Sequence, residues 1–175
     1  SIEPQLATSW EAIDPETWVF TLRDGVTFSD GKALRASDVE FSINRALSGA
    51  SDMLELIESI TSVKALNTNT VEIKTEGPNP ILLNQLSQIF IMSEGWSKKN
   101  GCELPQDFNA EEATHCSINA MGTGPFEITL REQDTRTVFE RNASWWGDQS
   151  QHNIDKIELL PINNDATRVA ALLSG

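Results

Sequence analysis

The stretch from residue 18 to residue 31 reads WVFTLRDGVTFSDG and predicts the start of the fold. Trp18, Phe20 and Leu22 alternate with other side chains, which is the period-2 pattern of a half-buried β-strand. The strand is followed by two turn signals, Arg23–Gly25 and Ser29–Gly31, on either side of a short apolar pair. We therefore expect one strand, and then a chain that turns sharply twice.

The neighbouring segments extend this unit in both directions. Residues 6–13 predict a strand before the stretch, joined to it by the turn signal at residues 14–16. After the stretch, Ser37 and Glu40 have the spacing of a capping box, in which each side chain binds the backbone N–H of the other residue. The apolar periodicity then predicts a helix to about Leu47, ended by Gly49.

The rest of the chain predicts a mixed α/β fold with β-hairpins and short helices. The last strand, loop and helix favour a parallel crossover. We expect hairpins at 60–65 with 70–74 and at 126–131 with 136–141, helical segments at 52–58, 81–86, 96–100 and 166–173, and strands at 89–92 and 154–160.

Composition narrows the class of protein. With 39% hydrophobic residues, the 175-residue chain can bury a substantial core. A net charge of −13 argues against a nucleic-acid partner, because no cationic stripe is present to hold phosphates. No apolar run reaches the length of about 18 residues that a membrane span needs. The chain stops directly after an amphipathic run, so we expect a fragment of a longer protein.

The two cysteines, Cys102 and Cys116, flank a polar segment. Three interpretations are open on the residues alone: a local disulfide, two free thiols that are partly buried, or a metal site. The metal site is the weakest of the three, because a thiol pair and His115 are too few ligands without a CxxC spacing.

Catalytic motifs are missing from the sequence. His115 and His152 lie in different segments, and neither belongs to an HExxH motif. There is no GxSxG motif, and the Gly122–Pro125 segment is not followed by the Lys of a P-loop. Carboxylates are abundant, so a hydrolase with an unrecognised carboxylate pair is the rival hypothesis. We predict that the chain is not an enzyme and needs no cofactor or metal.

The order of several motifs resembles the family 5 extracellular solute-binding proteins, the dipeptide-, oligopeptide- and nickel-binding group. The resemblance covers nearly the whole chain. It rests on residues 6–11, 18–31 and 34–42, on the Gly-Thr-Gly-Pro-Phe stretch at 122–126, on Arg-Asn-Ala-Ser-Trp-Trp at 141–146, and on 164–175.

This resemblance implies a subdomain fragment of a two-lobed binding protein that closes on its ligand like a hinged clamp. Residues 1–120 then correspond to the middle subdomain, with a loop or insertion at about 101–119. Residues 121–175 begin the next, incomplete segment of the ligand-binding lobe.

The implied function is the substrate-binding component of an ABC importer, which hands a small solute to a membrane permease. Short peptides are the expected solute; opines, oligosaccharides and nickel chelates are alternatives on the same scaffold. A sensory domain is a further rival. The expected location is the periplasm, or the outer face of the cell membrane through a lipid anchor. There Cys102 and Cys116 would be oxidised. We expect the fragment to be a monomer.

Two segments are candidates for contact with the solute. The glycine-rich stretch allows close approach of the backbone, or a bend between subdomains. A backbone or Thr123 hydroxyl contact is the functional interpretation; a tight subdomain crossover without ligand contact is the other. The end of the predicted strand, at residues 91–93, is a weaker candidate. The predicted ligand-binding residues are Met121, Gly122, Thr123, Gly124, Met92 and Ser93.

Overall fold

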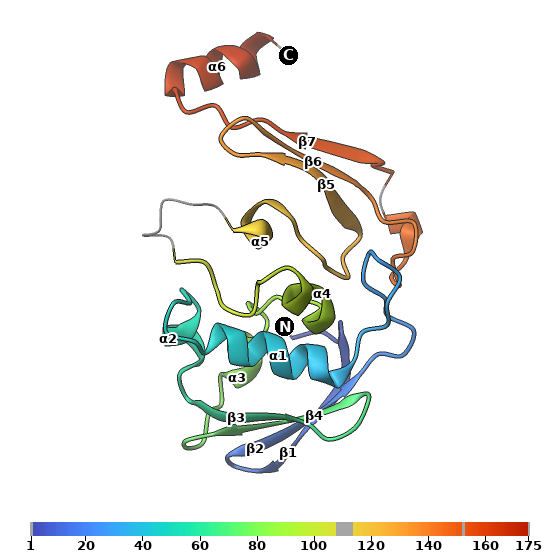
Figure 1. Cartoon of the computed structure of the whole chain (residues 1–175), viewed down its shortest axis with the longest axis vertical. Helices are drawn as coiled ribbons and strands as arrows, with labels where there is room; N and C mark the ends of the chain where they lie inside the picture. Colours follow the sequence, from blue (N-terminus) through green and yellow to red (C-terminus); the bar gives the residue numbers. More distant parts are fainter. Residues whose placement is uncertain (1, 108–113, 152, 175) are drawn as a thin grey trace.

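A computed structural model describes residues 2–107, 114–151 and 153–174 (Figure 1). It contains a four-stranded sheet of order β1-β2-β4-β3 and a three-stranded sheet of order β5-β6-β7, both fully antiparallel. The strands are β1 (Ala7–Asp14), β2 (Thr17–Leu22), β3 (Ile60–Ala65), β4 (Thr70–Thr75), β5 (Phe126–Glu132), β6 (Arg136–Arg141) and β7 (Lys156–Leu159). The helices are α1 (Ala36–Ala46), α2 (Leu54–Ile57), α3 (Leu82–Leu86), α4 (Glu94–Lys99), α5 (His115–Ile118) and α6 (Asp165–Ser174), with a 3-10 turn at Gln149–Gln151.

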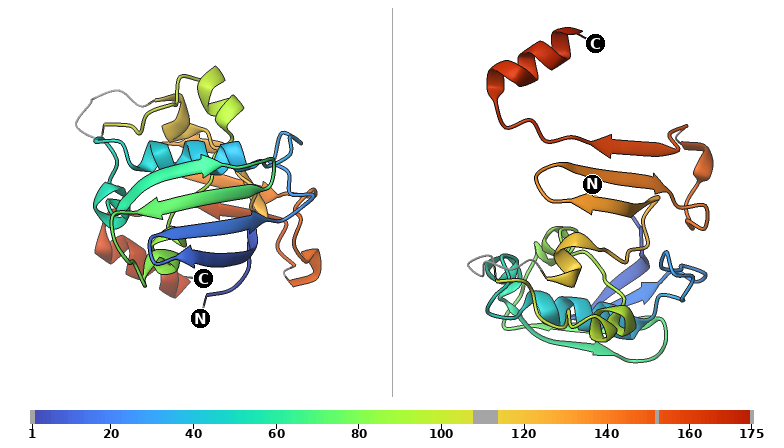
Figure 2. Two further views of the ribbon diagram at one scale, coloured as in Figure 1. Left: turned by 90° about the horizontal axis from the view of Figure 1, so that it is seen from below. Right: turned by 45° about the horizontal axis from the view of Figure 1, so that its top comes forward.

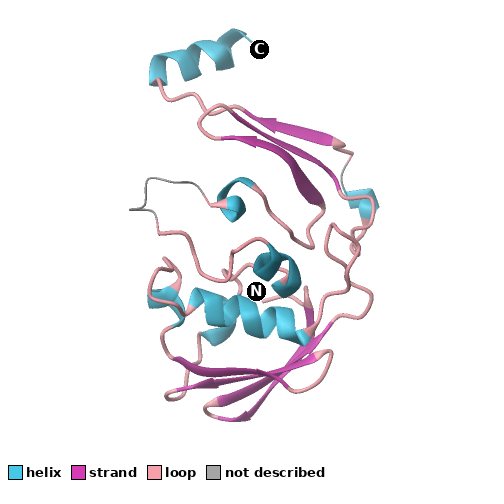
Figure 3. Ribbon diagram, in the orientation of Figure 1, coloured by secondary structure: helices cyan, strands magenta, loops and turns pink. Residues whose placement is uncertain are grey.

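The main core lies between the four-stranded sheet and α1, which crosses one face of it (Figures 1 and 3). Phe20 of β2 faces Val71 of β4 across the ladder, and both side chains are buried against this core. Ile43 of α1 covers them from above. The alternation predicted for residues 18–22 is therefore confirmed, as is the mixed α/β fold with hairpins and short helices.

A second, smaller core forms where the chain turns after β2. Val26, Phe28 and Leu34 are buried together, and the N–H of Leu34 donates to the carbonyl of Val26 at 2.9 Å. Gly25 and Gly31 have φ angles of 77° and 80°, in the left-handed region that glycine adopts without steric cost. The two predicted turn signals therefore fold the chain back on itself and bury the apolar residues between them.

The capping box predicted at Ser37 and Glu40 is wrong. Helix α1 begins earlier, with Arg35 as its N-cap residue, so Asp38 occupies the third helical position. Its carboxylate accepts from the N–H of Arg35 at 2.8 Å. The Glu40 carboxylate instead accepts from the N–H of Ala65 in β3 at 2.7 Å. The Glu40 side chain, which the local pattern assigned to the cap, therefore bonds to the sheet instead.

The strand predicted at residues 89–92 is also wrong, because this segment has no partner strand among the described residues and is bound to α1. The Ser42 hydroxyl accepts from the N–H of Met92 at 2.8 Å and lies 3.3 Å from its carbonyl. One helix side chain therefore satisfies the N–H of Met92, which a neighbouring strand would otherwise pair.

The closing strand and helix do not form a parallel crossover in the described part of the chain. Strand β7 pairs antiparallel with β6, and α6 extends away from the sheets (Figure 2). The apolar side chains of α6 are exposed, with Leu172 at 83% and Leu173 at 81%. Strand β7 is exposed along its whole length. This end of the chain has apolar surface that the rest of the chain leaves uncovered.

Residues 2–107, 114–151 and 153–174 contain no helix with the length and apolar character that a membrane span needs.

A disulfide joins Cys102 and Cys116, with their Cα atoms 6.1 Å apart. It ties the chain after α4 to α5, across a loop of which residues 108–113 lie outside the described part. The Arg45 guanidinium of α1 donates to the carbonyls of Cys102 and Leu104 at 3.0 and 3.1 Å. The cross-link therefore holds a segment that is also bound to the main helix.

We predict that this disulfide is present in the native protein and contributes about 3 kcal/mol to stability, as expected for a closed loop of about 15 residues. Denatured, non-reduced protein should show no free thiol in a labelling assay, and reduced protein should show two. The double variant C102S/C116S should unfold at lower denaturant concentration. Two reactive thiols in the non-reduced sample would contradict the prediction.

Candidate functional site

The predicted glycine-rich segment is the last part of the connection between the two sheets, after α5 and before β5, and it packs on the second core. The Ser29 N–H donates to the carbonyl of Gly122 at 3.1 Å, and the Ser29 hydroxyl donates to the sulfur of Met121 at 3.3 Å. Met121 itself packs against the core around Phe28. The segment is therefore attached to the turn that follows β2.

Its next carbonyls are bound by the segment after β6. The indole N–H of Trp146 donates to the carbonyl of Thr123 at 3.1 Å, and the buried side-chain amide of Asn142 donates to that of Gly124 at 3.0 Å. The backbone N–H of Asn142 donates to the carbonyl of Pro125 at 2.9 Å. Successive carbonyls from Gly122 to Pro125 thus point to protein donors, and they fix the path of the connection.

The N–H groups of the same segment, unlike its carbonyls, are unpaired in the described part of the chain. In the described part of the chain, neither the N–H groups of Gly122, Thr123 and Gly124 nor the Thr123 hydroxyl has a hydrogen-bond partner. Gly122 is exposed, and Thr123 and Gly124 are half-buried. A backbone held by its carbonyls presents its N–H groups in a fixed direction, so this connection could bind a carbonyl or carboxylate of a ligand.

Trp146 is held by charge as well as by hydrogen bonding. The Arg23 guanidinium carbon lies 4.7 Å from the centre of the indole ring, a cation–π arrangement, and the Arg23 Nε–H donates to the carbonyl of Gln5 at 3.0 Å. Two of the sequence motifs, around residue 23 and at 141–146, therefore meet at the connection. The motifs are scaffold contacts that shape this segment.

Met92 and Ser93 are used by the scaffold. Ser93 is buried, and its hydroxyl accepts from the N–H of Trp96 at 3.3 Å as the N-cap of α4. The backbone of Met92 is bound by Ser42, as described above. The neighbouring Ile91 and the more distant Met121 pack against the same core around Phe28. The structure thus brings the two candidate segments to one cluster, and it uses the Ser93 hydroxyl as the N-cap of α4.

Asp38 is a buried charged residue that the sequence did not single out as important. Its carboxylate accepts from the N–H groups of Arg35 and Glu94, both at 2.8 Å, and so joins the start of α1 to the start of α4. Burial raises the pKa of Asp38 above its ordinary value, although both N–H bonds oppose that change. An acidic residue in the first turn of a helix is the only local signal, and it does not reveal the second partner.

Replacing Asp38 by Asn should lower the free energy of unfolding by about 1–3 kcal/mol, because an amide donor then faces a buried backbone N–H. Folding raises the pKa of Asp38, so the folded protein binds its proton more tightly than the unfolded chain does. This proton binding stabilises the folded state fully below the ordinary pKa of 3.8, and the stabilisation is lost as the pH rises through the pKa of the folded state. The stability difference between wild type and D38N should narrow over that window.

Denaturant unfolding of both proteins at a series of pH values measures this difference. Asp52→Asn, at an exposed position, is the matched control and should change stability by less than about 0.5 kcal/mol. A difference that widens with rising pH would show that the two N–H bonds, and not burial, dominate the titration.

The histidines do not form a metal or catalytic cluster in the described residues. His115 lies against Trp96, with ring centres 5.5 Å apart, and His152 lies outside the described residues. Within the described ranges no group of three or more His, Cys, Asp or Glu side chains is placed to hold a metal ion.

Comparison with known proteins gives one family. The family described as bacterial extracellular solute-binding proteins, family 5 Middle, matches residues 1–175. The nickel-binding periplasmic protein of Escherichia coli K12 is 29% identical over 178 residues, which cover 100% of this chain and 32% of that protein.

Two solved structures extend the comparison. The binding protein MoaA of A. tumefaciens R10, in complex with mannopinic acid, has a TM-score of 0.83 at 26% identity over 100% of this chain and 35% of that one. DppA from Helicobacter pylori, in complex with the peptide STSA, has a TM-score of 0.75 at 27% identity over 99% and 36%. The chain therefore spans about a third of the length of the relatives that it matches.

Proposed function

Because this chain belongs to the family 5 extracellular solute-binding proteins, we propose that it is part of the substrate-binding component of an ABC importer. In this proposal the full-length protein captures a small solute outside the cytoplasm and delivers it to a membrane permease. It works in the periplasm or attached by a lipid anchor to the outer face of the cell membrane. The relatives named above are binding proteins, which supports a receptor over an enzyme.

Short peptides are the solute that we propose. The observation that carries this choice is the row of unpaired donors at Gly122, Thr123 and Gly124. Peptides offer carbonyl and carboxylate acceptors at regular intervals, which suit a run of backbone N–H groups. Opines, oligosaccharides and nickel chelates are the alternatives, and relatives named for nickel and for mannopinic acid keep two of them open.

We further propose that the boundary between the parts of the lobe lies at residues 120–121. Residues 1–120, with the loop at 101–119, then form the middle subdomain, and residues 121–175 begin the next segment. The separate sheets on either side of the connection support this division. So does the exposed apolar surface of α6, since a ten-residue helix is marginal in water without packing.

The experiment that tests the function is native mass spectrometry of the full-length protein as purified, followed by thermal unfolding with candidate solutes. We expect a co-purifying peptide, and a rise of melting temperature with short peptides but not with opines, oligosaccharides or nickel–histidine. Peptide hydrolysis by the protein would favour the hydrolase instead. Stabilisation by another solute class alone would overturn the choice of peptides.

Replacing Thr123 by Val in the full-length protein should weaken solute binding about tenfold, because one hydrogen bond to the ligand, worth about 1–1.5 kcal/mol, is lost. Stability should hardly change, since the hydroxyl has no partner among the described residues. Calorimetry measures the affinity. Thr129→Val, at an exposed position on β5, is the matched control. Equal affinity of T123V and T129V would remove Thr123 from the site.

A further inference from the structure

Each backbone N–H of the connection is oriented by the carbonyl of the residue before it, because a peptide group is planar and trans. The Thr123 N–H shares its peptide group with the Gly122 carbonyl, which the N–H of Ser29 holds. The Gly124 N–H shares its peptide group with the Thr123 carbonyl, which the indole of Trp146 holds. Two of the three unpaired donors are therefore fixed by bonds on the opposite side of their peptide groups.

The Gly122 N–H has no support of this kind. It shares its peptide group with the Met121 carbonyl, which accepts no hydrogen bond in the described part of the chain. The Met121 side chain packs on the second core, but the peptide plane after it can still rotate about the two soft backbone dihedrals. Glycine restricts this rotation less than any other residue. The direction of the Gly122 N–H therefore depends on the backbone that leads into it.

That backbone is the segment of residues 114–120, which contains α5. Within the described ranges, its hydrogen bonds join one part of the segment to another. Helix α5 lies next to β5 but has no buried side chain. The ring of His115 lies 5.5 Å from that of Trp96, and Cys116 forms the disulfide with Cys102. The disulfide is thus the one covalent tie between this segment and the residues around α4.

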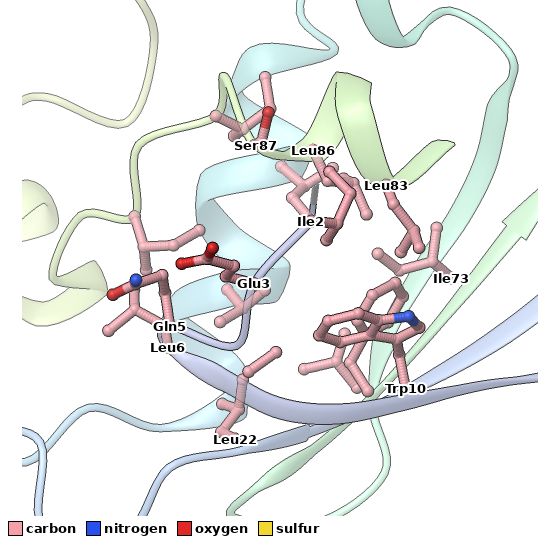
Figure 4. Close-up of a pocket in the computed structure, with 17 residues that line it drawn as sticks. Ile2, Glu3, Gln5, Leu6, Trp10, Leu22, Ile73, Leu83, Leu86 and Ser87 are labelled. Carbon is pink, nitrogen blue, oxygen red and sulfur yellow. The ribbon is translucent and has the colours of Figure 1, made fainter. Parts of the chain in front are cut away.

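The other end of the disulfide is firmly held. Cys102 is 2% exposed, its N–H donates to the carbonyl of Ser97 at 2.9 Å, and its carbonyl accepts from Arg45 at 3.0 Å. Arg45 belongs to α1, whose Val39 and Ile43 face the main core and line an apolar pocket between this helix, the sheet and α3 (Figure 4). The main core therefore fixes α1, and the disulfide extends this rigidity to α5.

We propose that the disulfide between Cys102 and Cys116 positions the Gly122 N–H, and that reducing it weakens solute binding. The inference rests on the proposed function, in which the Gly122–Gly124 donors bind the solute. Cys102 and Cys116 are positioning residues, since they touch no solute and act through α5 and the connection.

A dithiol such as dithiothreitol is the reductant that this step needs. Its thiolate attacks the sulfur of Cys116, the less buried of the two cysteines, and the S–S bond breaks. Cys102 leaves as a thiolate and takes up a proton. The second thiol of the reductant then displaces Cys116, which also becomes a thiol, and the reductant departs as a cyclic disulfide. Residues 114–120 have then lost their covalent tie.

Nitrogen-15 relaxation of the deuterated full-length protein, without solute, tests the positioning. In the oxidised protein we expect order parameters of about 0.85 for the amides of Gly122, Thr123 and Gly124. Reduction should lower the value for Gly122 below about 0.6 and leave the other two unchanged. The amide of Val71, in the buried part of β4, shows whether the fold is intact. The matched control C102S/C116S should resemble the reduced wild type and should not respond to dithiothreitol.

Calorimetry of the same samples with trialanine measures the consequence for binding. Reduction should weaken the affinity of the wild type about tenfold, which corresponds to the loss of one hydrogen bond to the ligand. The affinity of C102S/C116S should be the same with and without dithiothreitol.

An order parameter of Gly122 that does not change on reduction would overturn the proposal. An equal fall at Gly122, Thr123 and Gly124 would also overturn it, because the disulfide would then stabilise the whole region without positioning one donor. Equal affinity of oxidised and reduced wild type would remove the effect on the solute. Failure of the proposed function gives a separate result: oxidised wild type would not bind trialanine, and the order parameters would still decide the positioning role.

Discussion

Expressed alone, the 175-residue chain is expected to bind short peptides at least about a thousandfold more weakly than the full-length protein, a loss of about 4 kcal/mol. Small-molecule sites bury most of the ligand surface, and a hinged clamp does so by enclosing the ligand from both sides. The chain spans 32–36% of its relatives named above, so in the proposed receptor we expect the rest of the full-length protein to supply the other side of the clamp. The donors at Gly122–Gly124 can supply only part of the binding energy.

Calorimetry with the peptide that co-purifies with the full-length protein measures this difference. Circular dichroism of the isolated chain is needed beside it, because loss of binding is informative only if the four-stranded sheet is folded. Micromolar affinity of the folded isolated chain would contradict the prediction. It would mean that the 175-residue chain forms a complete site by itself.

The comparison of sequence and structure separates local signals from distant ones. The alternation at Trp18, Phe20 and Leu22 and the turns at Gly25 and Gly31 depend on residues within a few positions, and they were predictable. The same holds for both hairpins. In these segments, neighbouring residues determine the backbone conformation and the face of the sheet on which each side chain lies. The local sequence was therefore sufficient to predict them.

The wrong predictions have partners far away in the sequence. Glu40 had the right spacing for a cap, but it binds Ala65, 25 residues further on. The apolar run at 89–92 resembled a strand, but Ser42, 50 residues earlier, satisfies the backbone of Met92. In both cases a side chain of α1 found a tertiary partner that no local pattern encodes.

The candidate site was predicted as a segment but not as a geometry. The glycines and the resemblance singled out residues 121–124. Only the structure assigns their carbonyls to Ser29, Asn142 and Trp146 and so leaves the N–H groups unpaired. The N-cap role of Ser93 could not be predicted from the sequence, because it depends on where α4 begins. Which backbone groups are paired and which are left unpaired depends on residues far apart in the sequence, so the local pattern could not predict it.

Phe28→Ala is expected to be the most destabilising single substitution that we predict, with a loss of about 3–5 kcal/mol. Phe28 is 1% exposed and sits in the second core with Val26 and Leu34. Met121, in the connection itself, and Trp146, which follows β6, pack against that core. Removing the Phe28 ring leaves a cavity beneath the turn after β2 and beneath the connection that packs on it. The loss is large because the total stability of a domain is only about 5–15 kcal/mol.

The matched control is Phe90→Ala, since Phe90 is 88% exposed and the same change of side chain should cost less than about 0.5 kcal/mol there. Denaturant unfolding of both variants of the 175-residue chain gives the two values. Hydrogen exchange adds a local measurement: the Ser29 N–H, bonded to Gly122, should exchange faster in F28A than in F90A. Similar stability of the two variants would show that the second core does not hold the connection, and the fixed direction of the Gly122–Gly124 donors would then lose its physical basis.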